Sequence, residues 1–128
     1  MTQELHFVET PKAPAAVGPY SQAVVCNGMV FVSGQIPLVP SSNEMVGEEF
    51  GAQVRQVLSN MDAVLRGAGS ARTRVVKVNV YLTDMGRFAE LNEIYSEFFG
   101  EHRPARAAVQ VAALPRGAQV EMEAVAVV

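Results

Sequence analysis

Two stretches of the chain carry apolar residues at the three- and four-residue spacing of an amphipathic helix. The first is "EEFGAQVRQVLSNMDAVLRGAG" (48–69), in which Gly67 and Gly69 follow the apolar stripe as stop signals. The second is "MGRFAELNEIYSEFFG" (85–100), with Asp84 as the expected N-cap and Gly100 at its end. The residues expected to be buried are Phe50, Val54, Val57, Leu58, Met61, Val64 and Leu65 in the first helix, and Phe88, Leu91, Ile94, Tyr95, Phe98 and Phe99 in the second.

Six segments alternate apolar and polar residues or are rich in β-branched residues, which favours strands. They are residues 4–8, 21–26, 29–34, 75–82, 105–112 and 119–127. Residues 8–22 and 33–47 contain several Pro, Gly and Ser residues, and we expect irregular structure there. This order of elements predicts a single α+β domain over residues 1–128, with two helices packed on one face of a mixed six-stranded sheet.

The alternation also divides each strand between two faces of the sheet. The face beneath the helices is expected to hold Val30, Val32, Val76, Val78, Val80, Leu82, Ala105, Ala107, Val109, Val111, Val120, Met122 and Ala124. The second face is expected to hold Ser33, Gln35, Lys77, Asn79, Tyr81, Arg106, Ala108, Gln110, Glu121 and Glu123, together with Phe31, Val125 and Val127. Such a mixture suits either a solvated face or a contact between subunits, and the pattern leaves both open.

The composition limits the classes of function. With 49% hydrophobic and 18% charged residues, the chain is expected to be folded and globular. A net charge of −3 argues against non-specific binding to nucleic acid or to anionic membranes. The apolar runs are too short to span a bilayer, and the N-terminal residues do not follow the pattern of a signal peptide. The single cysteine, Cys26, fits a reducing compartment, so we expect a cytoplasmic protein.

Arg106 lies in the apolar segment "RPARAAVQV" (103–111), where a charge is unexpected. Its guanidinium group can bind a carboxylate through two parallel hydrogen bonds. If "LPRGA" closes a hairpin, Arg106 pairs near Val125, with Glu123 as a diagonal neighbour and Glu121 about 13 Å along the strand. Spacing alone favours a cross-strand pair between arginine and glutamate, and a site for a small carboxylate is the alternative.

Four other side chains have the chemistry of a catalytic or binding site. Glu121 and Glu123 are candidates for proton transfer or for orienting water, although acids on a solvated face are often only solubilising. Tyr20 is either a hydrogen-bond donor to a ligand or a packed turn residue. Ser33 lacks the G-x-S-x-G setting and a histidine base, which excludes a serine hydrolase. The two histidines lie far apart, and phosphate and dinucleotide motifs are absent, so we expect neither a metal nor a cofactor.

Five motifs in order resemble the RidA family of reactive-intermediate imine deaminases. The motifs are "GPYSQAV" (18–24), "SGQIP" (33–37), "VNVYLTDM" (78–85), "LNEIYSEFF" (91–99) and "RPARAAVQVAALPRGAQVEMEAVAV" (103–127). The resemblance runs from about residue 6 to the C-terminus. It implies a chorismate-mutase-like fold and a homotrimer with sites between subunits. It also implies hydrolysis of enamines and imines, such as 2-aminoacrylate and 2-iminopropanoate, to 2-oxo acids and ammonia.

The resemblance also implies roles for individual residues. Arg106 would bind the substrate carboxylate, and Glu121 would orient water or transfer the proton. The other residues implied to line the substrate pocket are Tyr20, Ser33, Gly34, Asn92 and Ala108. Some members carry a cysteine at the position of Ala108, so the mechanism in this chain has to work without that thiol.

The implied reaction needs little from the protein, because an imine conjugated to a carboxylate is already electrophilic. Binding the carboxylate, holding a water and assisting proton transfer are sufficient. The 13 Å offset implies that Arg106 and Glu121 lean together, or that neighbouring subunits complete the pocket. A small-carboxylate sensor without turnover is the alternative function. A ribonuclease is disfavoured by the acidic pI of about 5.3 and by the lack of a basic stripe.

Overall fold

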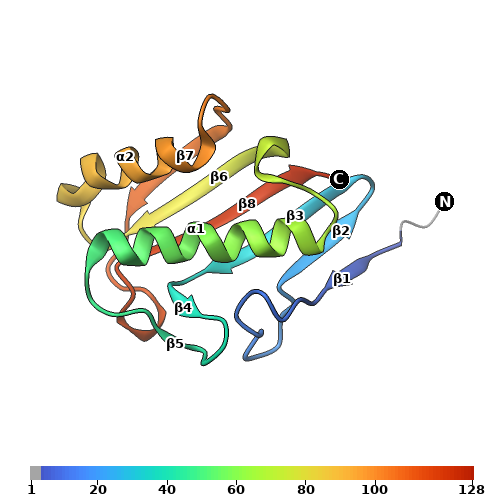
Figure 1. Ribbon diagram of the computed structural model, residues 1–128, viewed down its shortest axis with the longest axis horizontal. Helices are drawn as coiled ribbons and strands as arrows, with labels where there is room; N and C mark the ends of the chain where they lie inside the picture. Colours follow the sequence, from blue (N-terminus) through green and yellow to red (C-terminus); the bar gives the residue numbers. More distant parts are fainter. Residues whose placement is uncertain (1–3) are drawn as a thin grey trace.

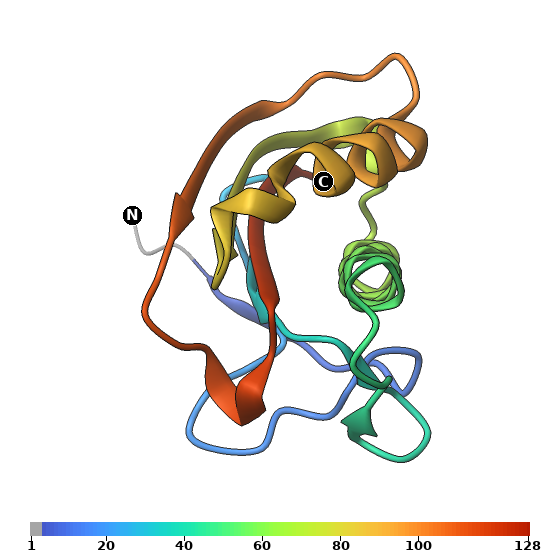
Figure 2. The same cartoon turned by 90° about the vertical axis from the view of Figure 1, so that its left-hand side faces the viewer.

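The computed structural model describes residues 4–128, which form one six-stranded sheet with two helices on the same face (Figures 1 and 2). The strand order is β1-β2-β3-β8-β6-β7, and β7 is an edge strand. The strands are β1 (His6–Val8), β2 (Ala23–Cys26), β3 (Met29–Gln35), β6 (Val75–Leu82), β7 (Ala105–Gln110) and β8 (Val120–Val127). The helices are α1 (Phe50–Gly67) and α2 (Phe88–Phe99). The predicted α+β architecture is confirmed.

Short elements complete the chain. The segment 33–47, predicted to be irregular, contains a small hairpin of β4 (Leu38–Val39) and β5 (Glu44–Met45). Single 3-10 turns η1 (Arg72–Arg74), η2 (Met85–Arg87) and η3 (Pro115–Gly117) lie in the connections. In the part of the chain that the structure describes, neither helix has the length and apolar character needed to cross a bilayer.

The two helices and the sheet supply the core together. Every residue of the predicted α1 stripe is buried, and a Leu, Val or Met of this kind stabilises the fold by about 1.5–3 kcal/mol. The backbone N–H of Ala52 donates to the Glu49 carboxylate at the start of α1. Asp84 caps the η2 turn through Gly86 N–H rather than α2 itself, which corrects the predicted cap. Gly100, at φ 63°, ends α2 as expected.

The connection between β6 and β7 runs through α2, so these two strands are parallel, with Val78 beside Arg106. Strand β8 lies on the other side of β6 and pairs antiparallel with both β3 and β6. The expected hairpin between residues 105–112 and 119–127 is therefore wrong, as is the pairing of Arg106 with Val125. The crossover through α2 places β7 beside β6, at the edge of the sheet. The chain then passes across β6, and β8 pairs with the other side of β6.

The faces of β7 are also the reverse of those predicted. Arg106 and Ala108 align with Val78 and Val80, whose side chains are buried beneath the helices. Val109 points to the opposite face and is 48% exposed. The prediction failed because it assigned the more apolar set to the helices, whereas β7 lies at the sheet edge. There a long side chain on the helix face can still reach solvent.

Two β-bulges shift the alternation by one residue. One lies between Val75 and Lys77, so that Val75 is buried and Val76 is exposed, contrary to prediction. The other lies between Val32 and Gln35 in β3, and it brings Gln35 to the buried face instead of the second face. The predicted division holds in β8, where Val120, Met122 and Ala124 are buried while Glu121 and Glu123 are not.

Candidate functional site

Arg106 is held at the edge of the sheet by three side chains of α2. Its Nη1 donates to Asn92 Oδ1 over 2.7 Å. Its Cζ lies 4.9 Å from the ring centroid of Tyr95 and 5.2 Å from that of Phe88. Positions 88, 92 and 95 share one face of the helix, so a single helical stripe orients the guanidinium.

The rest of the Arg106 guanidinium is available to a ligand. Among residues 4–128 it makes no salt bridge, and its only hydrogen bond is the one to Asn92. The expected cross-strand pair with Glu123 is absent from the described chain, because Glu123 lies on β8, beyond β6. The bond to Asn92 fixes the orientation of the guanidinium group. Its other N–H groups have no acceptor within residues 4–128 and are free to bind a carboxylate.

Arg106 lines a depression of about 440 Å³ between α2 and the start of β7. The other lining residues are Asn92, Tyr95, Ser96, Arg103 and Pro104. The Tyr95 hydroxyl is buried and has no hydrogen-bond partner among the described residues. Burial raises the pKa of Tyr95, and the nearby positive charge of Arg106 opposes part of that rise. Ala108, two residues beyond Arg106, packs against the core on the same face.

Glu121 lies in a second group of polar residues, on the face away from the helices. Its carboxylate is placed directly against Gly34, where an added Cβ would overlap Oε2 and lie 3.0 Å from Cδ. Gly34 sits in the β3 bulge, which bends the backbone opposite β8. The glycine leaves room for the Glu121 carboxylate, which a side chain at position 34 would displace.

The neighbouring Glu123 is engaged by donors from β6. Tyr81 Oη donates to Glu123 Oε2 over 3.0 Å, and Asn79 Nδ2 donates to the same oxygen over 3.1 Å. Glu121 makes no hydrogen bond through its carboxylate within residues 4–128. Burial raises the pKa of Glu121, and repulsion from Glu123 raises it further. The pKa of Tyr81 is also raised, first by burial and then by its bond to Glu123. Glu121 is therefore the carboxyl group better suited to hold or release a proton.

Two further predicted site residues are Ser33, in β3, and Tyr20, in the segment between β1 and β2. The Ser33 hydroxyl donates to the carbonyl of Ser21 over 2.5 Å, and the Ser33 N–H donates to the carbonyl of Gln22 over 3.0 Å. Because its proton is already donated, Ser33 has lone pairs left to accept a hydrogen bond from a ligand.

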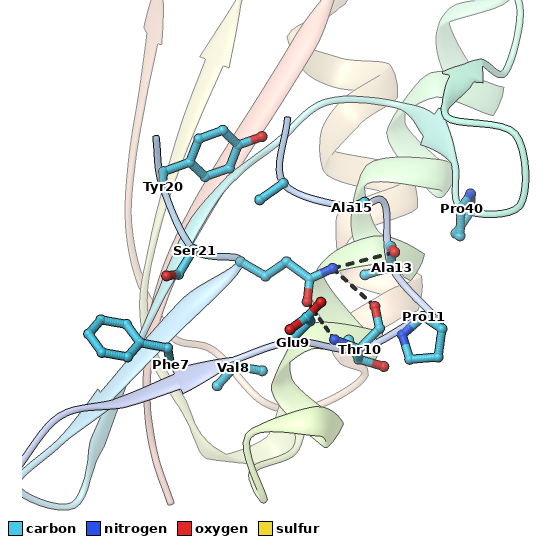
Figure 3. Close-up of a pocket in the computed structure, with 12 residues that line it drawn as sticks. Phe7, Val8, Glu9, Thr10, Pro11, Ala13, Ala15, Tyr20, Ser21 and Pro40 are labelled. Atoms are coloured by element: carbon cyan, nitrogen blue, oxygen red, sulfur yellow. Dashed lines mark hydrogen bonds between the residues drawn. The ribbon is translucent and has the colours of Figure 1, made fainter. Parts of the chain in front are cut away.

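Tyr20 is 53% exposed and lines a separate cavity of about 770 Å³. Figure 3 shows Tyr20 and Phe7 on one side of this cavity, with Pro11 and Pro40 on the other. Gln22 orders its wall, since its side-chain amide accepts from Thr10 N–H and donates to nearby carbonyls. The interpretation of Tyr20 as a packed turn residue is wrong, because half of the side chain is in contact with solvent.

Apart from Tyr20, which lines the separate cavity, the predicted site residues thus fall into two groups within the chain. Arg106, Asn92 and Ala108 lie on the helix face, whereas Gly34 and Glu121 lie on the opposite face, next to Ser33. Sequence reasoning assigned Phe88 and Tyr95 only to the core and gave no role to Ser96 or Arg103. The helical spacing of 88, 92 and 95 was the available signal. Within residues 4–128, no group of three or more His, Cys, Asp or Glu side chains is arranged to hold a metal ion.

Comparisons with known proteins agree on one family. The family model described as Endoribonuclease L-PSP matches residues 10–128. A RutC family protein of Pyrococcus abyssi is 48% identical over 98% of this chain and 98% of its own length. The human 2-iminobutanoate/2-iminopropanoate deaminase is 48% identical over 94% of this chain and 88% of its own length. The crystal structure of RidA from an Antarctic Psychrobacter species superposes with a TM-score of 0.93 at 48% identity, covering 96% and 99% of the two chains.

Proposed function

Because this chain belongs to the Endoribonuclease L-PSP family, which includes the YjgF and RidA proteins, we propose that it hydrolyses reactive enamines and imines of 2-amino acids. The products are 2-oxo acids and ammonia. The observation that carries the proposal is the unpaired part of the Arg106 guanidinium, oriented by Asn92 toward an open depression. The name of the human relative, at 48% identity, supports the same reaction.

In the proposed reaction, Arg106 binds the substrate carboxylate and so fixes the position of the adjacent C=N carbon. A water molecule adds to that carbon and one of its protons passes to nitrogen, which gives a carbinolamine. The hydroxyl proton of the carbinolamine then passes to the same nitrogen as ammonia leaves and the C=O bond forms. Glu121 is the group that moves the proton. Its raised pKa allows a carboxyl group to take up and return a proton closer to neutral pH. Ser33 accepts a hydrogen bond from the imine or ammonium nitrogen.

The arrangement supports a site shared between copies of the chain. Arg106 and Glu121 lie on opposite faces of the sheet, so one subunit presents only one of them to a small substrate. The face away from the helices also exposes apolar residues, with Phe31 at 49% and Val109 at 48%. We propose that this face packs against the Arg106 edge of the next subunit. A head-to-tail contact of this kind closes into a ring, and a trimer is the ring that we expect.

Two other functions are less well supported. A carboxylate sensor would need Arg106 and the side chains that orient it. It gives no reason for Glu121, on the opposite face of the sheet, to have a raised pKa. The word endoribonuclease in the family description is at odds with the net charge of −3 and the pI of about 5.3, since RNA binding depends on positive charge.

The proposal is tested by pyruvate release from freshly generated 2-aminoacrylate, with a serine or cysteine lyase as the source. The protein should accelerate the release, and Arg106→Ala should abolish that acceleration. If Arg106→Ala still accelerates the release, the protein is a deaminase but Arg106 does not have the role proposed for it. Absence of acceleration together with retained binding of small carboxylates would favour the sensor.

A further inference from the structure

A second arginine lines the depression that contains Arg106. Arg103 lies in the connection between α2 and β7, and its Nη1 donates to the carbonyls of Gly100 and His102. Both guanidinium groups belong to exposed residues, and neither makes a salt bridge among residues 4–128. No acidic side chain lines the depression within that range. Two uncompensated positive charges therefore share one small concave surface.

This charge pattern differs from that of two other depressions that are each lined by two basic side chains. Arg55 and Arg72 line one of them and Lys12 and Arg66 the other, and the acidic residue Asp62 lines both. The chain as a whole is negative. Two like charges in one depression repel each other, and a bound anion removes that repulsion. One monocarboxylate would neutralise only one of the two guanidinium groups.

We propose that the depression selects 2-imino dicarboxylates, with Arg106 binding the carboxylate next to the imine and Arg103 binding the distal carboxylate. The inference rests on the proposed deaminase function and narrows its substrate class. The backbone places the two residues three positions apart, at most roughly 10 Å between Cα atoms. Their long side chains can then reach the two ends of a short dicarboxylate. Ser96 and Tyr95 also line this depression, and the Ser96 hydroxyl adds a hydrogen-bonding group to it.

Arg103 is suited to this role by the way it is fixed. Its hydrogen bonds to two backbone carbonyls use one guanidinium nitrogen and limit the movement of the side chain. The remaining N–H groups can bind a carboxylate without first breaking an internal ion pair. A group that is partly ordered before binding loses less entropy when the ligand arrives.

The test compares imines generated in solution by an amino-acid oxidase from alanine, aspartate and glutamate, with trapping of the unreacted imine as the readout. The wild-type protein should show a higher kcat/KM for the dicarboxylic imines. Arg103→Ala should lower the ratio of dicarboxylate to monocarboxylate kcat/KM about tenfold, as expected for an exposed charge-assisted contact. Arg116→Ala is the matched control. It also removes an exposed arginine that donates to a backbone carbonyl, that of Asn43, and that lies outside the depression.

Calorimetric binding of 2-oxoglutarate and 2-oxobutanoate makes the inference independent of turnover. Arg103→Ala should weaken 2-oxoglutarate about tenfold and leave 2-oxobutanoate unchanged, whereas Arg106→Ala should weaken both. An unchanged ratio in Arg103→Ala, or an equal loss for both ligands, would overturn the inference and leave the deaminase proposal intact. A changed oligomeric state in Arg103→Ala, measured by light scattering, would assign Arg103 to a contact between copies and also overturn it. Loss of turnover in the wild type with retained selectivity for 2-oxoglutarate would instead contradict only the deaminase proposal.

Discussion

Arg106 and Glu121 lie on opposite faces of the same sheet. Strand β6 separates them, with Val78 beside Arg106 on the helix face and Tyr81 beside Glu121 on the other. Side chains on opposite faces of a sheet diverge, so these two cannot close on one three-carbon substrate from within a single subunit. If both residues act on one substrate, they must therefore come from different copies of the chain, and this can be tested directly.

Mixing two inactive variants should restore activity. If each site takes Arg106 from one subunit and Glu121 from the next, an equal mixture of Arg106→Ala and Glu121→Gln subunits rebuilds about a quarter of the sites in a randomly reassembled ring. The measurement is 2-aminoacrylate hydrolysis after the subunits are dissociated and reassembled together. Each variant reassembled alone serves as the control. Activity no higher than that of the separate variants would place both residues in a single-subunit site.

The geometry of the Arg106 guanidinium should matter as well as its charge. Arg106→Lys keeps the charge but loses the planar fork and the hydrogen bond to Asn92. We expect kcat/KM to fall roughly tenfold in Arg106→Lys and roughly 100-fold in Arg106→Ala, since a hydrogen bond to a charged group contributes about 1.5–3 kcal/mol. Arg116→Lys is the control and should change nothing. Equal activity of Arg106→Lys and the wild type would show that a point charge is sufficient.

Replacing Gly34 by alanine should displace the Glu121 carboxylate. The added Cβ overlaps Glu121 Oε2, the end of a flexible side chain, so we expect Gly34→Ala to destabilise the fold by at most about 1 kcal/mol but to reduce kcat, because the carboxylate has to move. In a Glu121→Ala background the clash is absent, and the cost of Gly34→Ala should be smaller. Urea unfolding of the four proteins gives the coupling between the two positions. Additive effects would mean that Glu121 moves aside freely and that Gly34 is required for another reason.

Stability should depend on pH through Glu121. Its pKa is raised in the folded state, so folding favours the protonated form. This stabilising effect is complete below the unfolded pKa of about 4.3 and is lost as pH rises through the higher folded value. The Tm of Glu121→Gln relative to the wild type should therefore increase as pH rises from 3 to 8. In a Glu123→Gln background the increase should be smaller, because Glu123 contributes to the raised pKa. A pH-independent difference in Tm would contradict the raised pKa.

Local pattern was sufficient to predict most of the fold. The apolar residues of α1 recur at helical spacing and all of them are buried; the stripe that faces the core is set by residues close in sequence. The same holds for β6 and β8, whose predicted bounds differ from the observed ones by at most one residue. Gly69 and Gly100, at φ 83° and 63°, follow the two helices for an equally local reason, the positive φ favoured just beyond a helix C-terminus.

The motifs also identified the candidate site residues, but not their arrangement. Arg106 and Asn92 were named separately from the sequence, and the structure brings them to 2.7 Å. The assumed hairpin placed Arg106 near Glu123, and it failed because the register of a strand depends on which partner it finds in three dimensions. The crossover through α2 gave β7 a parallel partner that no local turn signal could reveal.

The sequence by itself determined the apolar stripes of the two helices, the bounds of most strands and the candidates for the chemistry, since each depends on neighbours within a few positions. Of the residues predicted to be buried in the helices, only Phe88 and Phe98 of α2 are partly buried instead. Only the tertiary structure decided that β8 lies between β3 and β6, that two bulges shift Gln35 and Val76, and that Arg106 and Glu121 occupy different faces. In a sheet, a change of partner or a shift of one residue reverses the direction of every side chain that follows. The partner and the register of a strand depend on packing between segments that are distant in sequence. The residues of one segment alone therefore do not reveal them.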